Sequence, residues 1–374
     1  MNPPVLCRRP TLVLKKISIA NPPQAPTRHC VAKRVEVVSW DRLDARDLDR
    51  INAMRRSDPE KRSPFFANEF FAAVYEARGD VWVAVIEDEH DVIGYLPFHR
   101  IGRSANPVGR CFNDAHNLIA WPGTQLDWRW LLRACRVDSF DFHALAGNHD
   151  HLDGRARFAP RASFAAHLGD DSNAFLQQLE KDHRTIKKQE QKTRKMIRQR
   201  GPIRFELDCE DPSILETGIH WKRQQYRRTD ILDLFLPTWT RRMIRILHRS
   251  ESECRVVVSA MWAGDTLMAV HVGMVEDDLL HYWFPSYNVA HRVYSPGTAL
   301  FKAIVRGASG AGIRTLDMGY GEQPYKRKQT DQITHVVAGC VATHPWVRWQ
   351  RQAAQNVRSV VKKVPMKRTL KRWL

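Results

Sequence analysis

Hydrophobic and polar residues recur along the chain with two periods, and each period predicts a different element. Apolar segments interrupted by an acidic or glycine-containing turn occur at residues 80–101 and 254–275, and both predict β-hairpins. A third strand, a helix and a fourth strand are expected after each hairpin. These lie at 116–123, 128–135 and 139–146 in the first stretch, and at 279–286, 298–308 and 313–319 in the second.

The order β-β-β-α-β therefore occurs twice, with the two copies about 170 residues apart. A chain of 374 residues is also too long for one ordinary core. We therefore expect two similar domains, one at 35–172 and one at 173–345. Helical periodicity precedes both copies, at 41–57 and 67–79 before the first, and at 172–201, 214–229 and 236–250 before the second.

The two ends of the chain differ from these domains. Residues 1–34 are basic and rich in proline, without the apolar core of a signal peptide, and we expect a disordered leader. Residues 346–374 begin as a basic amphipathic helix, and we expect its apolar stripe to pack on the second domain. The alternative is a free membrane-binding helix. The stripe consists of Trp346, Trp349, Ala353, Val357, Val360 and Val364.

The formal net charge of +18 indicates a polyanionic partner: nucleic acid, a phosphate-rich cofactor or an anionic membrane surface. Charge alone does not choose between them. The longest apolar runs are far short of a membrane span. Seven scattered cysteines without a CxxC pair are typical of a reducing cytoplasm. We expect a cytoplasmic protein, with the periphery of the inner membrane as a second location.

The connection into the predicted helix at 298–308 contains Ser295, Gly297 and Thr298, with a proline between the first two. Free backbone N–H groups and the positive end of a helix dipole meet at such a turn, so it suits a phosphate group. Arg292 adds positive charge nearby. The alternative is an ordinary helix start with proline in the first turn.

The last predicted strand of the second domain leads into a run of reactive side chains. A carboxylate, a phenol and an ammonium group together can transfer protons and stabilise an oxyanion. A surface turn with a salt bridge is the alternative interpretation. The run consists of Asp317, Gly319, Gly321, Glu322, Tyr325 and Lys326.

Three other places carry candidate site residues. Asp114 precedes a predicted strand, where it could line a cleft. Lys222 and Tyr226 share one face of a predicted helix by their spacing of four, although a plain amphipathic helix has the same pattern. A histidine-rich segment lacks a recognisable ligand spacing, so we expect a polar loop and no metal. That segment carries His143, His149, His151 and Asp153.

Four stretches resemble the CelD-like branch of the GNAT acyltransferase superfamily, which is associated with cellulose and exopolysaccharide production and is related to Fem-type aminoacyltransferases. The last stretch is the most specific, because an S-P-G helix start is followed by D-x-G-x-G-E-x-x-Y-K. The stretches are SPFFANEFFAAVYEARGDVWVAVIED (63–88), FNDAHNLI (112–119), WKRQQYRRTDILDLFLPTW (221–239) and SPGTALFKAIVRGASGAGIRTLDMGYGEQPYKRK (295–328).

The resemblance implies an α/β fold with a mixed sheet, built from two tandem GNAT-like acyl-CoA N-acyltransferase domains. It implies acetyl-CoA or another acyl-CoA as co-substrate and no metal. Ser295 stands where the usual pyrophosphate loop, Q/R-x-x-G-x-G/A, has glycine. The donor would meet Arg292, Ser295, Gly297 and Thr298, and the acceptor would meet Asp114, Lys222, Tyr226, Gly319 and Gly321.

In such a fold Glu322 would be the base, and Tyr325, or Lys326 held by Asp317, would return a proton to the leaving thiolate. A backbone N–H would bind the oxyanion. The acceptor would be a small molecule or a carbohydrate-linked or lipid-linked group in polysaccharide or cell-envelope biosynthesis. One alternative is an aminoacyl-tRNA-dependent Fem-type transferase, with nucleic acid as partner. Another is a non-catalytic accessory protein of a membrane polysaccharide synthase, docked through its basic C-terminal helix.

Overall fold

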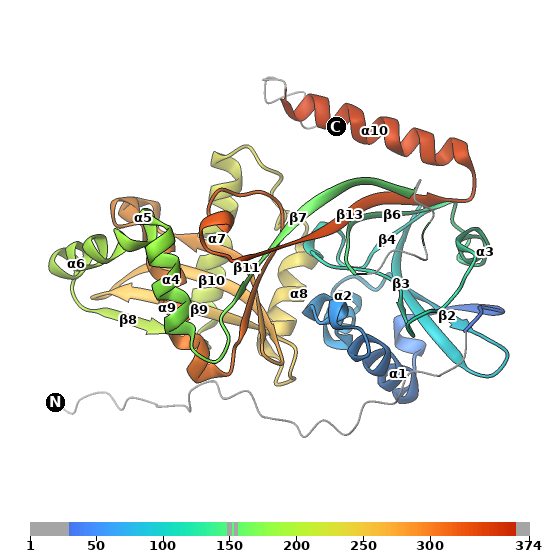
Figure 1. The fold of residues 1–374 in the computed structure, drawn as a ribbon, viewed down its shortest axis with the longest axis horizontal. Helices are drawn as coiled ribbons and strands as arrows, with labels where there is room; N and C mark the ends of the chain where they lie inside the picture. Colours follow the sequence, from blue (N-terminus) through green and yellow to red (C-terminus); the bar gives the residue numbers. More distant parts are fainter. Residues whose placement is uncertain (1–29, 148–151, 153–155, 364–374) are drawn as a thin grey trace.

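The computed structural model describes residues 30–147, 152 and 156–363, and most of the expected leader lies outside them. Its strands form one 13-stranded sheet that runs through the whole molecule (Figure 1). The strand order is β1-β2-β3-β4-β6-β13-β7-β12-β11-β10-β9-β8, with β5 beside β3. Parallel and antiparallel pairs both occur, so the expected α/β class with a mixed sheet is confirmed.

The first half of the chain follows the expected order closely. Asp44 and Asp47 form a capping box at the first helix, and Gly79 ends the second at φ 76°, a conformation that favours glycine. The strand expected at 116–123 was wrong in extent, since only two of its residues form a strand. The elements are β1 (Arg34–Ser39), α1 (Ala45–Arg56), α2 (Asn68–Arg78), β2 (Val81–Glu87), β3 (Val92–Ile101), β4 (Ser104–Pro107), β5 (Ile119–Ala120), α3 (Trp128–Ala134), β6 (Ser139–Leu145) and β7 (Arg157–His167).

The second half contains three helices where one was expected at 172–201, because His183 leaves the helical conformation at φ −127° and ψ 100°. The other expected helices and strands are present with small shifts of their ends. The elements are α4 (Ser172–Asp182), α5 (Arg184–Lys187), α6 (Gln189–Arg200), β8 (Ile203–Glu206), α7 (Pro212–Arg228), α8 (Thr238–Arg249), β9 (Arg255–Ala263), β10 (Thr266–Glu276), β11 (Leu279–Tyr287), η6 (Val289–Tyr294), α9 (Pro296–Ala308), β12 (Thr315–Tyr320), β13 (Gln332–Ala342) and α10 (Pro345–Lys363).

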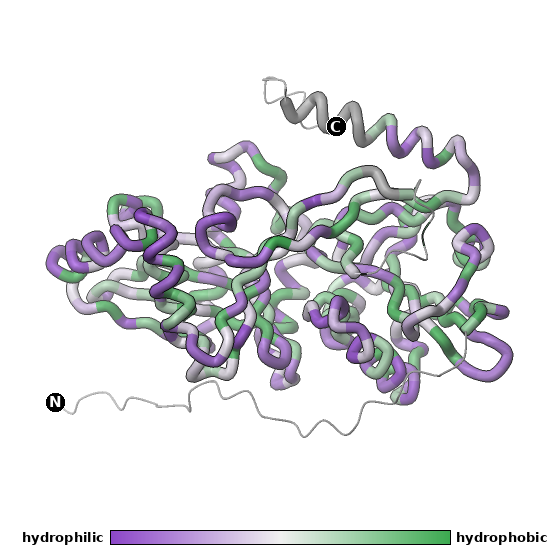
Figure 2. Tube along the Cα trace, viewed as in Figure 1, coloured by the Kyte–Doolittle hydropathy of each residue, from purple (hydrophilic) through white to green (hydrophobic). Residues whose placement is uncertain are grey.

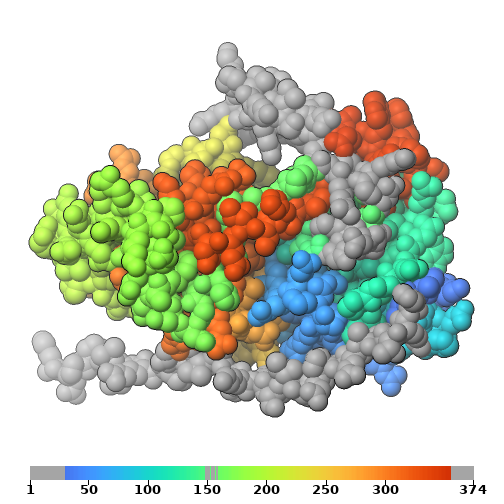
Figure 3. All heavy atoms as spheres, in the orientation of Figure 1, coloured from blue at the N-terminus to red at the C-terminus, as the bar shows by residue number. Residues whose placement is uncertain are grey.

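The two long strands β7 and β13, which the sequence did not predict, join the halves. The last strand of the first half, β7, pairs with β12 of the second, while β13 returns to pair with β6 of the first. β7 and β13 also pair with each other. Figure 3 shows the orange-red segment that includes β13 crossing from one half to the other. Each half therefore completes its sheet with a strand from the other half.

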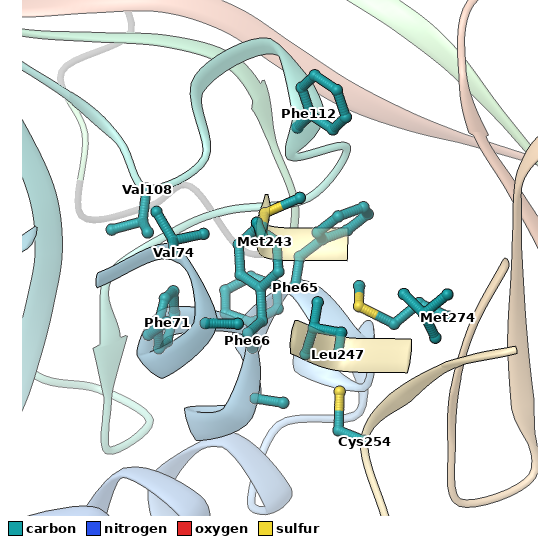
Figure 4. Close-up of a cluster of buried hydrophobic side chains, with 14 of the residues drawn as sticks. Phe65, Phe66, Phe71, Val74, Val108, Phe112, Met243, Leu247, Cys254 and Met274 are labelled. Carbon is teal, nitrogen blue, oxygen red and sulfur yellow. The ribbon is translucent and has the colours of Figure 1, made fainter. Parts of the chain in front are cut away.

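A shared core and a buried ion pair also connect the halves. Phe65 and Phe66 of the first half pack in one cluster with Met243 of α8 (Figure 4). Arg55 of α1 donates to the carboxylate of Glu276 of β10 over 2.5 Å, and both side chains are buried. Breaking a buried pair of this kind typically costs about 3–5 kcal/mol, so the relative position of the halves is fixed.

The last helix, α10, was expected to pack its apolar stripe on the second half, but the two tryptophans that begin the stripe are exposed, and the side chains of Val357, Val360 and Val364 lie outside the described part of the chain. The helix contacts β13, and the guanidinium of Arg351 bonds to Ser104 of β4 and Asp141 of β6. Trp346 and Trp349 remain about 60% exposed, at 61% and 60%. In Figure 2 the strands are largely green and hydrophobic, whereas the outer helices carry more purple, hydrophilic positions. Among the described helices, none is long and apolar enough to cross a membrane.

Candidate functional site

The parallel strands β11 and β12 separate in the middle of the second half. They pair over three positions, from Leu279 with Thr315 to His281 with Asp317. Beyond that point β11 continues to Tyr287 without pairing to β12, and β12 has an irregular register between Asp317 and Gly319. Backbone N–H and C=O groups on this edge of β11 are therefore available to a ligand.

A histidine bridges two carboxylates where the strands separate. Its Nδ1 lies 3.0 Å from Oδ2 of Asp317, and its Nε2 lies 3.4 Å from Oδ2 of Asp114. This histidine, His281, is completely buried, whereas the carboxylates are each 20% exposed. Because Asp114 comes from the first half of the chain, the site is built by both halves.

The charges in this cluster depend on one another. Burial alone would lower the pKa of His281, but the carboxylates of Asp317 and Asp114 outweigh burial and raise it to about 9. Burial would raise the pKa of Asp317, but the imidazolium of His281 and the N–H of Gly319 lower it. At neutral pH the cluster therefore contains an imidazolium paired with the carboxylate of Asp317.

The connection between β4 and β5 holds Asp114 in place. Asn113 braces it, because the side-chain amide donates to the carbonyl of Val108 over 3.0 Å and accepts the N–H of Ala115 over 2.9 Å. The ring of His143 lies 2.9 Å from the carbonyl of Asn113. Asp114 is thus presented by a buried polar network and not by a free loop.

Gly319 allows Asp114 and His281 to meet. Its φ is +66°, which disfavours residues with a side chain, and its N–H donates to Oδ1 of Asp317 over 2.8 Å. A Cβ atom here would lie 2.3 Å from Oδ2 of Asp114 and 3.1 Å from Cε1 of His281. Both the conformation and the space therefore require glycine.

A buried lysine, Lys326, and a half-buried one, Lys222, flank the opening. Nζ of Lys326 donates to the carbonyls of Gly319 and Tyr320 over 3.1 and 2.8 Å. Burial lowers the pKa of Lys326, although Asp114 and Asp317 oppose this. Nζ of Lys222 on α7 donates to the carbonyl of Pro285 over 3.2 Å. Burial, followed by the charge of Lys326, lowers the pKa of Lys222 to about 8.

Three tyrosines surround Asp114 and remain neutral. Burial is the main reason that the pKa values of Tyr226, Tyr320 and Tyr325 are raised, and the negative charge of Asp114 is the next. A neutral phenol can donate a hydrogen bond to a substrate oxygen or a thiolate. The structure therefore brings together both predicted acceptor residues from α7, the predicted Asp114, and much of the D-x-G-x-G-E-x-x-Y-K run.

Glu322 lies apart from this cluster. Its side chain is 63% exposed and forms a 3.0 Å ion pair with Arg327. Gly321 fixes the turn before it at φ 103°, and its N–H donates to the carbonyl of Ala162. The role of Glu322 as base stays a prediction, but its surroundings are those of a surface ion pair.

The predicted donor turn lies at the start of α9. Ser295 adopts φ 51° and ψ 57°, the left-handed conformation that favours glycine, and its Oγ accepts from Nζ of Lys192 over 2.7 Å. Arg292 is exposed beside it. The nearest atom to a Cβ on Gly297 would be 3.7 Å away on Tyr287, so the backbone there is open to a ligand. The N–H of Thr298 bonds to the carbonyl of Ser295 and is already used.

Sequence reasoning missed His281 and Lys192. A lone histidine in the otherwise apolar segment LLHYWF was the available signal for His281. Lys192 gave no such signal, because it is one of many basic residues in α6. Of the histidine-rich segment, His149, His151 and Asp153 lie outside the described residues. Within the part of the chain that is described, no group of three or more His, Cys, Asp or Glu side chains is arranged to hold a metal.

Comparisons with known proteins identify the fold. Residues 181–327 match the family described as acetyltransferase (GNAT) domain. FemX aligns with 82% of this chain and 96% of its own, at 10% identity and a TM-score of 0.51, which shows a shared fold. The C-terminal domain of a putative lysylphosphatidylglycerol synthetase from Agrobacterium fabrum aligns with 85% of this chain and 96% of its own, at 13% identity and a TM-score of 0.48.

A tandem GNAT protein from the clavulanic acid biosynthesis pathway aligns with 83% of this chain and 99% of its own, at 12% identity and a TM-score of 0.43. No curated protein matches the chain. The separated strands, the helix start at Ser295 and the family match lie in the same region of the chain. Residues 181–327 are therefore similar to a GNAT acetyltransferase domain, and the chain shares the fold of FemX.

Proposed function

We propose that this protein is a CelD-like acyltransferase, which moves an acetyl or other acyl group from an acyl-CoA thioester to an amine or hydroxyl acceptor. The separation of β11 and β12 beyond His281 and Asp317 carries the proposal. A thioester carbonyl placed in this opening meets backbone N–H groups of β11, which can stabilise the oxyanion of the tetrahedral intermediate.

The acyl-CoA pyrophosphate binds at the start of α9. The N–H of Gly297 is at the second helical position, where the helix provides no carbonyl partner, and the helix dipole favours an anion there. Lys192 and Arg292 add positive charge from two sides. Lys302 of α9 holds Glu190 of α6 over 2.5 Å, so the helix that carries Lys192 keeps its position.

Asp114 is the carboxylate best placed to take the proton of the acceptor. Nε2 of His281 lies 3.4 Å from its carboxylate, and the negative charge of Asp114 helps burial to raise the pKa values of Tyr226, Tyr320 and Tyr325. The new bond joins the acceptor nitrogen or oxygen to the acyl carbon, and the carbon–sulfur bond breaks. The acceptor proton passes to Asp114, and the thiolate receives a proton from Tyr325 or Lys326.

The charges around the opening support an anionic acceptor. Lys222, Lys326 and Arg161 add positive charge to this region, and the guanidinium of Arg161 lies 5.5 Å from the ring centre of Tyr320. An acidic carbohydrate or a phosphate-bearing lipid-linked group fits such a site. We therefore place the reaction in polysaccharide or cell-envelope biosynthesis on the cytoplasmic side.

Calorimetric titration with acetyl-CoA, longer acyl-CoAs and aminoacyl-tRNA tests this function. We expect an acyl-CoA to bind, and Gly297→Glu to weaken it by about tenfold or more, because a carboxylate then occupies the phosphate position. Gly310→Glu is the matched control, since a side chain at Gly310 meets open space at the other end of the helix region. Binding of aminoacyl-tRNA alone would instead favour a Fem-type transferase, and binding of neither would favour an accessory protein.

A further inference from the structure

Large apolar side chains are exposed at two separate places that both lie toward the upper edge of the molecule in Figure 1. The first is the connection between α7 and α8, and the second is the start of α10. Figure 2 shows a green, hydrophobic segment at the tip of the α7–α8 connection. We define the apolar face by its five residues, with their exposed fractions: Ile231 (57%), Leu232 (71%), Leu236 (65%), Trp346 (61%) and Trp349 (60%).

The α7–α8 connection is held firmly enough to present its apolar side chains. The carboxylate of Asp233 accepts from Arg223 over 2.8 Å and from the N–H of Phe235 over 3.0 Å. Phe235 is fully buried and packs between Phe112 and Phe284. These contacts hold the backbone at Asp233 and Phe235. The neighbouring apolar residues Ile231, Leu232 and Leu236 are therefore held at the surface.

The start of α10 is turned so that its two tryptophans face outward. Arg351 binds Asp141 and Ser104 on the body of the protein. With 100° per residue, positions 346 and 349 lie roughly opposite position 351 on the helix. Trp346 and Trp349 stack on each other with ring centres 4.9 Å apart. The start of the helix is thus anchored by Arg351, with the two tryptophans on the side away from this contact.

Positive charge accompanies these apolar residues. The sequence of α10 contains no acidic residue and has basic residues at Arg348, Arg351, Arg358, Lys362 and Lys363. Arg227 and Arg228 are exposed at the end of α7, next to the apolar connection. Exposed aromatic and aliphatic residues beside clustered basic residues are typical of surfaces that bind anionic membranes.

We propose that the apolar face docks on a membrane of anionic phospholipids, with its aliphatic and tryptophan side chains entering the headgroup region and the exposed Arg227 and Arg228 contacting lipid phosphates. RNA is the less suitable partner at the α7–α8 connection, because isoleucine and leucine offer bases no stacking surface. Phe235 of the α7–α8 connection also stacks on Tyr226, with ring centres 6.3 Å apart. The membrane-facing side therefore adjoins the acceptor side of the opening.

Vesicle flotation of the full chain tests this docking. We expect flotation with vesicles of equal parts phosphatidylglycerol and phosphatidylcholine, and much weaker flotation with phosphatidylcholine alone or at high salt. The double variants Trp346→Ser with Trp349→Ser, and Ile231→Ser with Leu232→Ser, should each reduce the bound fraction by about tenfold or more. Melting curves check that each variant is folded.

Ile197→Ser is the matched control, because Ile197 is 42% exposed on the basic helix α6 but lies at another end of the molecule. It should change binding by less than about twofold. The proposal is overturned if the wild-type chain does not float with anionic vesicles, or if both folded double variants bind like the control. It is also overturned if the wild-type chain binds polyuridine, both double variants lose that binding, and anionic vesicles fail to compete for it.

Discussion

Each half of the molecule has an equivalent connection, after β4 in the first half and after β11 in the second, and the two connections serve different purposes. In the second half, the connection after β11 leads through η6 to the helix start at Ser295 and Gly297, which suits a phosphate. In the first half, the connection after β4 carries Asp114 into the opening of the other half. Both connections follow a strand in a short parallel pair, β11 with β12 and β4 with β6.

The two halves therefore contribute differently to the candidate site. Only the second half has a long helix after this connection, α9, whereas α3 in the first half is short. The exchanged strands β7 and β13 then hold Asp114 against His281, because they fix the two sheets as one. The site can exist only when both halves are present, and four experiments test this division.

The largest effect is expected for Gly319→Ala, which separates the contributions of the halves. The new methyl group occupies the position of the Asp114 carboxylate, and φ +66° is unfavourable for alanine. Turnover should fall by about a hundredfold or more, with a loss of about 2–4 kcal/mol of unfolding free energy. Gly310→Ala meets open space and should leave both quantities unchanged. An active, stable Gly319→Ala protein would disprove the contact between the halves.

Removing the buried ion pair tests whether the halves are held together apart from the site. Arg55→Met leaves the carboxylate of Glu276 buried without its partner, so we expect a loss of about 3–5 kcal/mol in denaturant unfolding. Arg56→Met is the control, because Arg56 forms only a 3.9 Å pair between exposed side chains. Equal stability of the two variants would show that the shared hydrophobic core alone fixes the halves.

A third experiment compares Asp114 of the first half with Glu322 of the second half as candidates for the catalytic base. Asp114→Asn should lower turnover by about a hundredfold at saturating acyl-CoA, while leaving acyl-CoA binding intact. Glu322→Gln should lower it by less than about threefold, because Glu322 is exposed and paired with Arg327. The reverse result would assign the base to the second half, as the sequence suggested.

The smallest effect is the pH dependence of stability. His281 has a pKa of about 9 in the folded protein, above its ordinary value, so its contribution is complete below pH 6.5 and is lost as pH rises through 9. The pKa of Lys222 is lowered to about 8, so its contribution to stability rises with pH, but only above pH 8. Between pH 6.5 and 8 stability should fall by up to about 1.4 kcal/mol per pH unit.

His281→Gln should remove this slope, which chemical unfolding at several pH values measures. The neighbouring His271 is a useful control, since burial lowers its pKa to about 3 and its contribution changes only below pH 6.5. A slope unchanged in His281→Gln would mean that the imidazole is not charged between the carboxylates.

The local sequence determined most elements and the chemistry of the second half. Alternation and helical spacing gave the hairpins β2–β3 and β9–β10, and the run from Asp317 to Lys326 marked the end of β12 as reactive. The glycines in that run were also interpretable, because positive φ values are a local property. Charge and spacing likewise indicated a basic last helix.

Only the tertiary structure decided which residues meet. Strands β7 and β13 depend on partners more than a hundred residues away, so their pairing has no local signal. For the same reason Asp114 and Asp317 were separate candidates in the sequence, and the cluster that they form with His281 could not be predicted. The exposure of Trp346 and Trp349 at the start of α10 was not foreseen, because an apolar stripe specifies a face without saying what covers it. Spacing along the chain fixes a side chain within its element, whereas burial and charge pairing depend on how the elements pack.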